Sequence, residues 1–360
     1  MRTMIAATYT QGEGLHVLDV PAPTISDGDL LVRVAASAIC GTDLRTIRNG
    51  HRKLAPGQRI VLGHEFAGII ECPGDHGTTF PAGMRVAIAP NVGCGQCDLC
   101  VQGFTNMCPD YQAFGISWDG ALTEYVRVPA AAVAQGNIVP IPEHVPFQDA
   151  ALIEPLSCVV NGNREARIRF GDVVVVVGAG PIGLLHLQLA RLSGARKVIM
   201  ADLQPSRLEV AEAMGAEVAV NPAEEDLAGR IHYETSGRGA DVVITACAVA
   251  SAQQESIGWL APFGRVCFFG GLPSQDSPVP IDTNAIHYKN LLVTGVSGAS
   301  LHDFRVAARL ISSRRIDVAK IVSHSFPLRD IELAFQQAMR QDAMKVVVRT
   351  EADGAEAARG

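Results

Sequence analysis

The 360-residue sequence has few aromatic residues, no long hydrophobic run and no excess of positive charge. Because a membrane-spanning helix needs about 20 consecutive apolar residues, the chain is not expected to cross a membrane. The net charge of −7, with both signs interspersed, leaves no basic stripe for phosphate backbones, so nucleic acid is not an expected partner. Residues 1–7 run directly into strand-like sequence without a signal peptide pattern, which favours a cytoplasmic location.

The chain is long enough for two domains, and its composition and periodicity differ between two successive stretches. Up to about Pro155 it is rich in glycine, proline and short β-branched runs, which predicts an irregular β-rich domain. From about Gly171 to Val296, strand-like and helix-like segments alternate, which is typical of a parallel sheet with helical crossovers. The fold class is therefore α/β.

Individual elements can be predicted from periodicity and capping residues. Strands are expected at Leu31–Val34, Arg85–Ile88, Tyr125–Val128, Asp172–Val177, Lys197–Ala201, Glu217–Val220, Asp241–Ala246, Arg265–Phe269 and Leu291–Val296. Helices are expected at Pro181–Leu192, Ser206–Met214 (capped by Gly215), Ser251–Leu260 and just after Leu301. The segment Lys345–Val348 reads as a last strand, with Lys345 expected at the surface, and Glu351–Gly360 is expected to fray.

A glycine-rich turn follows the five valines at 173–177. Its residues are Gly178, Ala179, Gly180, Pro181, Ile182 and Gly183. A turn of this kind between a buried strand and a helix lets a pyrophosphate approach the backbone and the helix N-terminus.

A carboxylate at the end of the next strand strengthens this interpretation. Asp202 lies 22 residues beyond Gly180, where it can bind the ribose hydroxyls of a dinucleotide. It would repel a 2′-phosphate, so NAD is favoured over NADP, although Arg207 close behind leaves NADP open.

Four of the nine cysteines form a compact cluster. They are Cys94, Cys97, Cys100 and Cys108. Four thiolates at this spacing can surround one tetrahedral Zn²⁺ and leave no open position, which predicts a structural zinc site. Disulfides and an iron–sulfur cluster are the competing interpretations.

Three further segments place potential metal ligands beside small or turn-forming residues. They are Cys40-Gly41-Thr42-Asp43, Gly63-His64-Glu65 and Glu154-Pro155-Leu156-Ser157. Each is a weak signal alone, because single buried cysteines and histidines are common. Their order along the chain, together with Gly63–Gly68 followed by Gly74, resembles the zinc-containing medium-chain dehydrogenase (alcohol dehydrogenase) family over residues 5–348.

This resemblance implies a GroES-like β-barrel catalytic domain plus a Rossmann domain with a doubly wound parallel sheet. The first would comprise residues 1–155 and 300–360, with a structural zinc lobe at 90–110. The second, residues 156–299, would bind NAD. Homodimers or homotetramers are typical of such proteins.

The resemblance also implies roles for single residues. Cys40, His64 and Glu154 match the ligands of a catalytic zinc, and Glu65 matches a carboxylate that can exchange with water there. Asp43 matches the residue that orients the zinc-bound histidine. Thr42 matches the hydroxyl that bonds the substrate oxygen and passes its proton outward.

One position departs from the family pattern. Relatives often have a histidine five residues after the first ligand, where this sequence has Arg45. Arginine cannot shuttle protons near neutral pH, so Arg45 is expected to contact the cofactor's pyrophosphate or an anionic substrate. His51 is a candidate for the relay, and a plain loop histidine is the alternative.

Together these features predict a zinc-dependent enzyme that transfers hydride from a secondary alcohol to NAD⁺. Glu154-Pro155-Leu156-Ser157 resembles the sorbitol and polyol dehydrogenase branch, so a polyol, sugar alcohol or cyclitol is the expected substrate. An amino-alcohol dehydrogenase acting on L-threonine and a non-enzymatic nucleotide-binding protein of the same fold are the alternatives.

Overall fold

The computed structural model describes residues 3–350. The chain divides into two compact units, one made of Met1–Ser157 with Ala299–Gly360 and the other of Cys158–Gly298. The predicted fraying of Glu351–Gly360 lies outside the described residues. Within those residues, no helix is both long and apolar enough to cross a membrane.

The first unit is built on mostly antiparallel sheets, with one parallel pairing between its two C-terminal strands. A seven-stranded sheet has the order β10-β6-β5-β3-β18-β17, with β9 also paired to β3. Its strands are β3 (Leu30–Ala38), β5 (Glu65–Cys72), β6 (Arg85–Ile88), β9 (Tyr125–Val128), β10 (Ile138–Pro140), β17 (Val322–Pro327) and β18 (Lys345–Arg349). A second sheet contains β1 (Thr3–Thr10), β2 (Gly14–Pro21) and β4 (Arg59–Val61), and a small one contains β7 (Asn91–Val92) and β8 (Gln112–Ala113). The four strands predicted in this unit are confirmed as β3, β6, β9 and β18.

Alternating apolar residues of these strands form the core of the first unit. Phe66, Leu30 and Val34 belong to a cluster on the large sheet, while Leu62 and Phe335 belong to a second cluster beside the sheet of β1, β2 and β4. Burying such side chains contributes roughly 1.5–3 kcal/mol each, which fixes the strand ends from which the site residues project.

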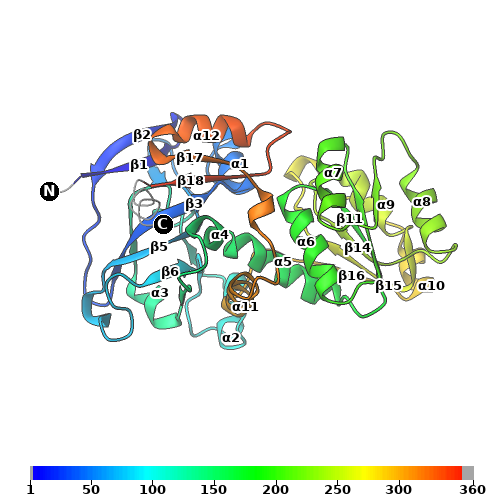
Figure 1. The fold of residues 1–360 in the computed structure, drawn as a ribbon, viewed down its shortest axis with the longest axis horizontal. Coiled ribbons are helices and arrows are strands. Elements are labelled where there is room, and N and C mark those ends of the chain that lie inside the picture. The colour runs from blue at the N-terminus through cyan, green and yellow to red at the C-terminus, as the bar shows by residue number, and fades with distance from the viewer. Residues whose placement is uncertain (1–2, 351–360) are drawn as a thin grey trace. The chain divides into compact units, whose positions relative to one another are not determined.

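Short helices connect and cover these sheets (Figure 1). They are α1 (Gly41–Asn49), α2 (Asp98–Val101), α3 (Ala130–Gln135), α4 (Phe147–Ala151), α11 (Leu301–Ser312) and α12 (Ile331–Ala338). Helix α5 (Ile153–Ala166) begins in the first unit and continues into the second. Single 3-10 turns occur at Gly74–His76, Thr105–Met107, Ser274–Asp276, Ala319–Ile321 and Leu328–Asp330.

The second unit is a six-stranded parallel sheet with the order β13-β12-β11-β14-β15-β16. Its strands are β11 (Val173–Val177), β12 (Lys197–Ala201), β13 (Val218–Val220), β14 (Ala240–Thr245), β15 (Leu260–Phe268) and β16 (Leu292–Gly295). Its helices are α6 (Pro181–Leu192), α7 (Pro205–Ala213), α8 (Leu227–Glu234), α9 (Ala250–Ser256) and α10 (Thr283–Lys289), and Figure 1 shows them beside these strands. This is the strand order of a Rossmann domain.

All six strands predicted for the second unit are present, and β11 is fully enclosed, with every valine buried. Gly215, with a φ of +98°, follows α7 as the predicted cap. The predicted helix Ser251–Leu260 was wrong at its end, because α9 stops at Ser256 and Leu260 already belongs to β15. Leu260 pairs with Ala240 of β14, so sheet pairing and burial outweigh the helical pattern there.

Candidate functional site

The four-cysteine lobe brings its thiols together as the spacing predicted. The Sγ atoms of Cys94, Cys97, Cys100 and Cys108 all lie within 4.8 Å of one another. Cys94 Sγ lies 4.0 Å from Cys100 Sγ, and Cys97 Sγ lies 3.8 Å from Cys108 Sγ. All four are free thiols, so the disulfide interpretation is wrong for these residues.

These separations match a single tetrahedral ion. Zn–S bonds of about 2.3 Å place the corners of a tetrahedron roughly 3.8 Å apart. The backbone is shaped for this approach, because a Cβ on Gly93 would lie 2.4 Å from Cys100 Sγ. Backbone N–H groups of Gln96 and Cys97 also lower the pKa of Cys94 to about 6, which favours the thiolate that a metal requires.

A second group of ligand atoms converges in the same unit. Cys40, His64 and Glu65 place one ligand atom each within 4.8 Å of the others. Cys40 is the N-cap of α1, His64 follows β4, and Glu65 begins β5. Cys40 is half-buried, while His64 and Glu65 are buried, so the group forms a metal site of limited solvent access.

Asp43 ties the two ligand segments to each other. Its Oδ2 accepts a hydrogen bond from the backbone N–H of Cys40 (2.9 Å), and its Oδ1 accepts one from that of Gly63 (3.4 Å). Oδ1 also lies 3.8 Å from Nδ1 of His64. A carboxylate facing Nδ1 leaves Nε2 of the imidazole for a metal, as the sequence predicted for Asp43.

The electrostatics of this group favour a bound cation. Burial alone would lower the pKa of His64, but the negative charges of Cys40, Asp43 and Glu154 outweigh it and raise the pKa well above its usual range. His64 Nδ1 is buried without a hydrogen-bond partner. A divalent ion would meet the same negative charge that otherwise draws a proton, so the donor set fits Zn²⁺.

Lys345 is a member of the site that the sequence analysis misplaced. It was expected at the surface, yet it is buried and its Nζ lies 2.7 Å from Glu65 Oε1 and 3.1 Å from the carbonyl oxygen of Ile39. It comes from β18, which pairs with β3 of the same sheet. No local pattern indicates this partnership, because the two residues are 280 positions apart.

Glu154 lies near this group without belonging to its tightest part. It occupies the first turn of α5, is buried, and its charge raises the pKa of both His64 and Lys345. Within the described chain, however, the ligand atoms that lie within 4.8 Å of one another are those of Cys40, His64 and Glu65.

Thr42 lies in the first turn of α1, two residues after Cys40. Its Oγ1 accepts a hydrogen bond from Arg45 Nη2 at 3.2 Å. His51 is buried, and its Nδ1 accepts the backbone N–H of Lys53 at 3.2 Å, which leaves Nε2 as the protonated nitrogen of the neutral ring. Burial, followed by the charges of Arg52 and Lys53, lowers the pKa of His51.

The glycine-rich turn of the second unit has the predicted strand–turn–helix setting, between β11 and α6. Gly178 has a φ of +104°, a conformation that favours glycine. A Cβ on Gly183 would lie 1.8 Å from the carbonyl oxygen of Gly178, so only glycine lets the helix pack this closely. Gly180 is the N-cap of α6 and Pro181 its first residue, which leaves backbone N–H groups facing an anion.

Asp202 follows β12 and closes the same turn. Its Oδ2 accepts the backbone N–H of Ala179 at 2.7 Å, and its Oδ1 accepts that of Gln204 at 2.9 Å. Arg207 Nη1 lies 3.9 Å from Oδ2. The carboxylate is therefore held beside the turn, where a ribose can reach it.

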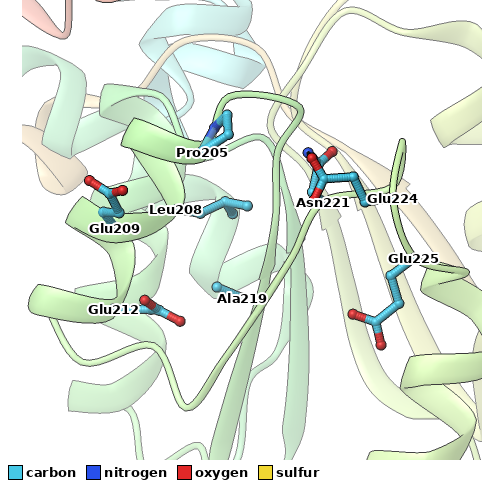
Figure 2. Close-up of a pocket in the computed structure, with 8 residues that line it drawn as sticks. All are labelled: Pro205, Leu208, Glu209, Glu212, Ala219, Asn221, Glu224 and Glu225. Carbon is cyan, nitrogen blue, oxygen red and sulfur yellow. The ribbon is translucent and has the colours of Figure 1, made fainter.

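A separate hollow of about 260 Å³ lies on the same unit between α7 and the segment after β13 (Figure 2). It is lined by Pro205, Leu208, Glu209, Glu212, Ala219, Asn221, Glu224 and Glu225. The four carboxylates would repel phosphate groups, so the nucleotide phosphates are not expected there.

Comparisons with known proteins agree with both sites. Residues 26–143 match the family model "Alcohol dehydrogenase GroES-like domain", and residues 181–313 match "Zinc-binding dehydrogenase". An L-threonine 3-dehydrogenase of Bacillus subtilis (strain 168) is 34% identical over 93% of this chain and 95% of its own length. The chain belongs to the zinc-binding alcohol dehydrogenase family.

Further relatives differ from one another in the substrate and the cofactor that their names give. A sorbitol dehydrogenase of Bacillus subtilis (strain 168) is 30% identical over 96% of this chain and 97% of its own length. A solved structure described as a zinc-binding dehydrogenase target from Sinorhizobium meliloti 1021, bound to NADP, has 31% identity and a TM-score of 0.90 over 97% of this chain and 100% of its own. An alcohol dehydrogenase from E. coli CFT073, complexed with NADH, has 30% identity and a TM-score of 0.88 over the same shares.

Family membership and the two ligand groups together define the enzyme class. The chain is a zinc-dependent, NAD(P)-linked dehydrogenase that acts on alcohols, with a structural four-cysteine zinc site and a catalytic cysteine, histidine and glutamate site. The GroES-like and Rossmann domains are confirmed.

Proposed function

We propose that this enzyme oxidises the secondary hydroxyl of a polyol, sugar alcohol or cyclitol to the ketone, with NAD⁺ as hydride acceptor. The observation that carries the proposal is the convergence of Cys40, His64 and Glu65 in a site with a family-wide role in alcohol oxidation. L-Threonine is the second candidate, since its 3-hydroxyl is also secondary and the relatives include an L-threonine 3-dehydrogenase.

Cys40, His64 and Glu154 are proposed as the protein ligands of the catalytic zinc, with Glu65 as the carboxylate that exchanges with water. Glu154 is buried and its charge reaches His64, which supports its place in the shell. The contact of the Glu65 carboxylate with Lys345 supports a role in which Glu65 exchanges with water at the zinc, because the carboxylate has a second partner when it leaves the metal. Zinc bound here would lower the pKa of the substrate hydroxyl.

Thr42 is proposed to bond the reacting oxygen and to take its proton. Its Oγ1 already accepts from Arg45, so its own hydrogen is free to turn toward the substrate alkoxide or toward the relay. His51 is proposed as the next relay group. Its lowered pKa supports this role, because the ring is neutral at neutral pH: Nδ1, which bonds the backbone N–H of Lys53, would take the relayed proton while Nε2 releases one to solvent.

The glycine turn and Asp202 are proposed to bind the cofactor through Gly178, Gly180, Pro181, Ile182, Gly183 and Arg207. The half-buried carboxylate of Asp202 supports a preference for NAD, because a 2′-phosphate would meet its negative charge. The ion pair of Arg207 with Asp202 reduces the guanidinium charge available to that phosphate.

We further propose a cytoplasmic homodimer or homotetramer. The thiols of Cys94, Cys97, Cys100 and Cys108, which lie close together without forming a disulfide, support a reducing compartment, because thiols in an oxidising one are usually paired.

The proposal is tested by following NADH absorbance with zinc-loaded enzyme and a panel of hexitols, pentitols, cyclitols, L-threonine and simple alcohols. Polyol turnover with kcat/KM at least tenfold above that for L-threonine supports it. Turnover of L-threonine alone would favour the amino-alcohol alternative, and binding of NAD without any turnover would contradict both.

A further inference from the structure

A concentration of positive charge borders the catalytic cluster. Residues 44–64 contain Arg45, Arg48, Arg52, Lys53 and Arg59 but no aspartate or glutamate, in a chain whose net charge is −7. The side chains of these cations are exposed. Their charge is therefore available to a ligand that approaches from solvent.

Protein carboxylates do not neutralise this charge. Across residues 3–350, ion pairs are found for many arginines, but none is found for Arg45, Arg48, Arg52 or Lys53. Arg45 and Lys53 contact neutral groups instead: Arg45 Nη2 donates to Thr42 Oγ1 at 3.2 Å, and Lys53 Nζ donates to Ser117 Oγ at 3.0 Å. These charges therefore form no ion pair that stabilises the fold. Two of them, Arg52 and Lys53, help to lower the pKa of the nearby His51.

Arg45 is the member of this group nearest to the chemistry. It lies three residues after Thr42 on α1, so the two side chains share one helix face, and Nη2 donates to Thr42 Oγ1 at 3.2 Å. The same helix begins at Cys40, its N-cap. The guanidinium therefore lies only one hydrogen bond beyond the hydroxyl proposed to bond the reacting oxygen.

Arg48, Arg52 and Lys53 add exposed positive charge within α1 and just after it. Lys53 is placed by Ser117 and by the ring of Tyr111, whose centroid is 5.2 Å from Nζ. The segment after α1 and the loop at 111–118 are thereby joined.

We propose that the substrate is an anionic polyol derivative, an aldonate or a polyol phosphate, with its carboxylate or phosphate monoester a few bonds from the reacting hydroxyl, and that Arg45 binds this oxyanion. This rests on the proposed function, since it takes the hydroxyl to be oxidised at Cys40 and His64. The planar guanidinium forms paired, charge-assisted hydrogen bonds with either oxyanion, whereas the hydroxyls of a neutral polyol offer no charge. Arg48, Arg52 and Lys53 draw the anion toward the site.

The experiment compares kcat/KM of the zinc-loaded enzyme, at saturating NAD⁺, for matched sets of one carbon skeleton. Each set contains a neutral polyol, its terminal carboxylate and its terminal phosphate, with three to six carbons. We expect at least one anionic member to exceed its neutral counterpart by about tenfold or more. The carboxylate and phosphate arms then identify which oxyanion is used.

Arg45→Gln is expected to lower kcat/KM for the anionic member about 10- to 100-fold more than for the neutral member, whose turnover loses only the support that Arg45 gives Thr42. Arg45→Lys should recover part of the loss, and Arg59→Gln, in the same acid-free segment, should change neither. Added salt should weaken turnover of the anionic member only.

Three results would overturn the inference. A neutral polyol could be preferred in every set, or Arg45→Gln could lower kcat/KM equally for neutral and anionic members. A raised KM for NAD⁺ with unchanged discrimination would instead assign Arg45 to the cofactor's pyrophosphate. Absence of turnover with every set would contradict the proposed function, and calorimetric binding of the aldonates and polyol phosphates to the zinc-loaded protein would then test Arg45 alone.

Discussion

The ammonium group of Lys345 lies 2.7 Å from Oε1 and 2.5 Å from Oε2 of Glu65. The two side chains are 8% and 1% exposed, so neither charge is appreciably hydrated. A pair of this kind is costly to separate, because removing one partner leaves an uncompensated buried charge.

Lys345→Met is expected to lower the free energy of unfolding by about 3–5 kcal/mol. Urea denaturation of zinc-loaded protein measures this change. Lys320→Met is the matched control, because Lys320 pairs with Asp317 at 3.4 Å on the surface and its loss should cost less than about 1 kcal/mol. Equal effects of the two substitutions would show that the buried pair contributes nothing.

Cys97→Ser is expected to reduce bound zinc from two ions per chain to one, because the four-cysteine group loses a ligand whose Sγ lies 3.8 Å from that of Cys108. Elemental analysis of purified protein gives the ratio. Cys72→Ser, which alters an exposed thiol outside both groups, should keep both ions. Two zinc ions in the Cys97 variant, or iron in the unaltered protein, would contradict the assignment.

Asp202→Asn is expected to raise the ratio of kcat/KM for NADP⁺ to that for NAD⁺ by about tenfold or more, since it removes a charge that opposes the 2′-phosphate. The amide oxygen can still accept one of the two backbone N–H groups of Ala179 and Gln204, so the turn is retained. Initial rates with each cofactor give the ratio. An unchanged ratio would mean that Asp202 does not discriminate between the cofactors.

His51→Gln is expected to flatten the acidic limb of the pH dependence of kcat/KM. The pKa of His51 is lowered from 6.5, so the limb that it produces lies below that pH. Glutamine still offers an acceptor to the backbone of Lys53 but cannot carry a relayed proton. A profile that coincides with that of the unaltered enzyme would remove His51 from the relay.

His186 is expected to make the protein less stable in acid. It is fully buried in α6 against Phe269, and burial lowers its pKa from 6.5 to about 3. Because the unfolded chain binds the proton first, stability falls as pH drops from 6.5 toward 3, by up to about 1.4 kcal/mol per unit. His186→Leu should reduce this slope in denaturation measured at several pH values, whereas substitution of the exposed His287 should not.

Much of the fold and of the candidate site could be predicted because its signals are local. The spacing of the four cysteines between Cys94 and Cys108 is sufficient to predict a small metal-binding lobe. The turn from Gly178 to Gly183 is recognisable because its close approaches require glycine. The neighbourhood of Asp43 and His64, whose side chains lie 3.8 Å apart, followed from the family resemblance and not from a local pattern.

The misplaced residues depend on contacts between distant segments. The sequence around Lys345 is typical of a surface lysine, but the pairing of β18 with β3 buries it. The sequence around Leu260 is helical in pattern, but Leu260 pairs with Ala240 in the sheet. Periodicity describes one segment at a time, so it cannot report which buried carboxylate a lysine will meet. From the sequence only Arg45 was singled out, and the lack of carboxylate partners for Arg45, Arg48, Arg52 and Lys53 within the described residues required the structure.

The two backbone hydrogen bonds of Asp43 have a consequence for metal loading. They fix the spacing between the Cys40 and His64 segments through the polypeptide itself, before any ion arrives. Because the backbone holds the ligands at this spacing, little conformational entropy is lost when zinc binds. Exchange of the catalytic ion for cobalt or cadmium should therefore leave the surrounding fold intact, which makes this centre suitable for spectroscopic substitution.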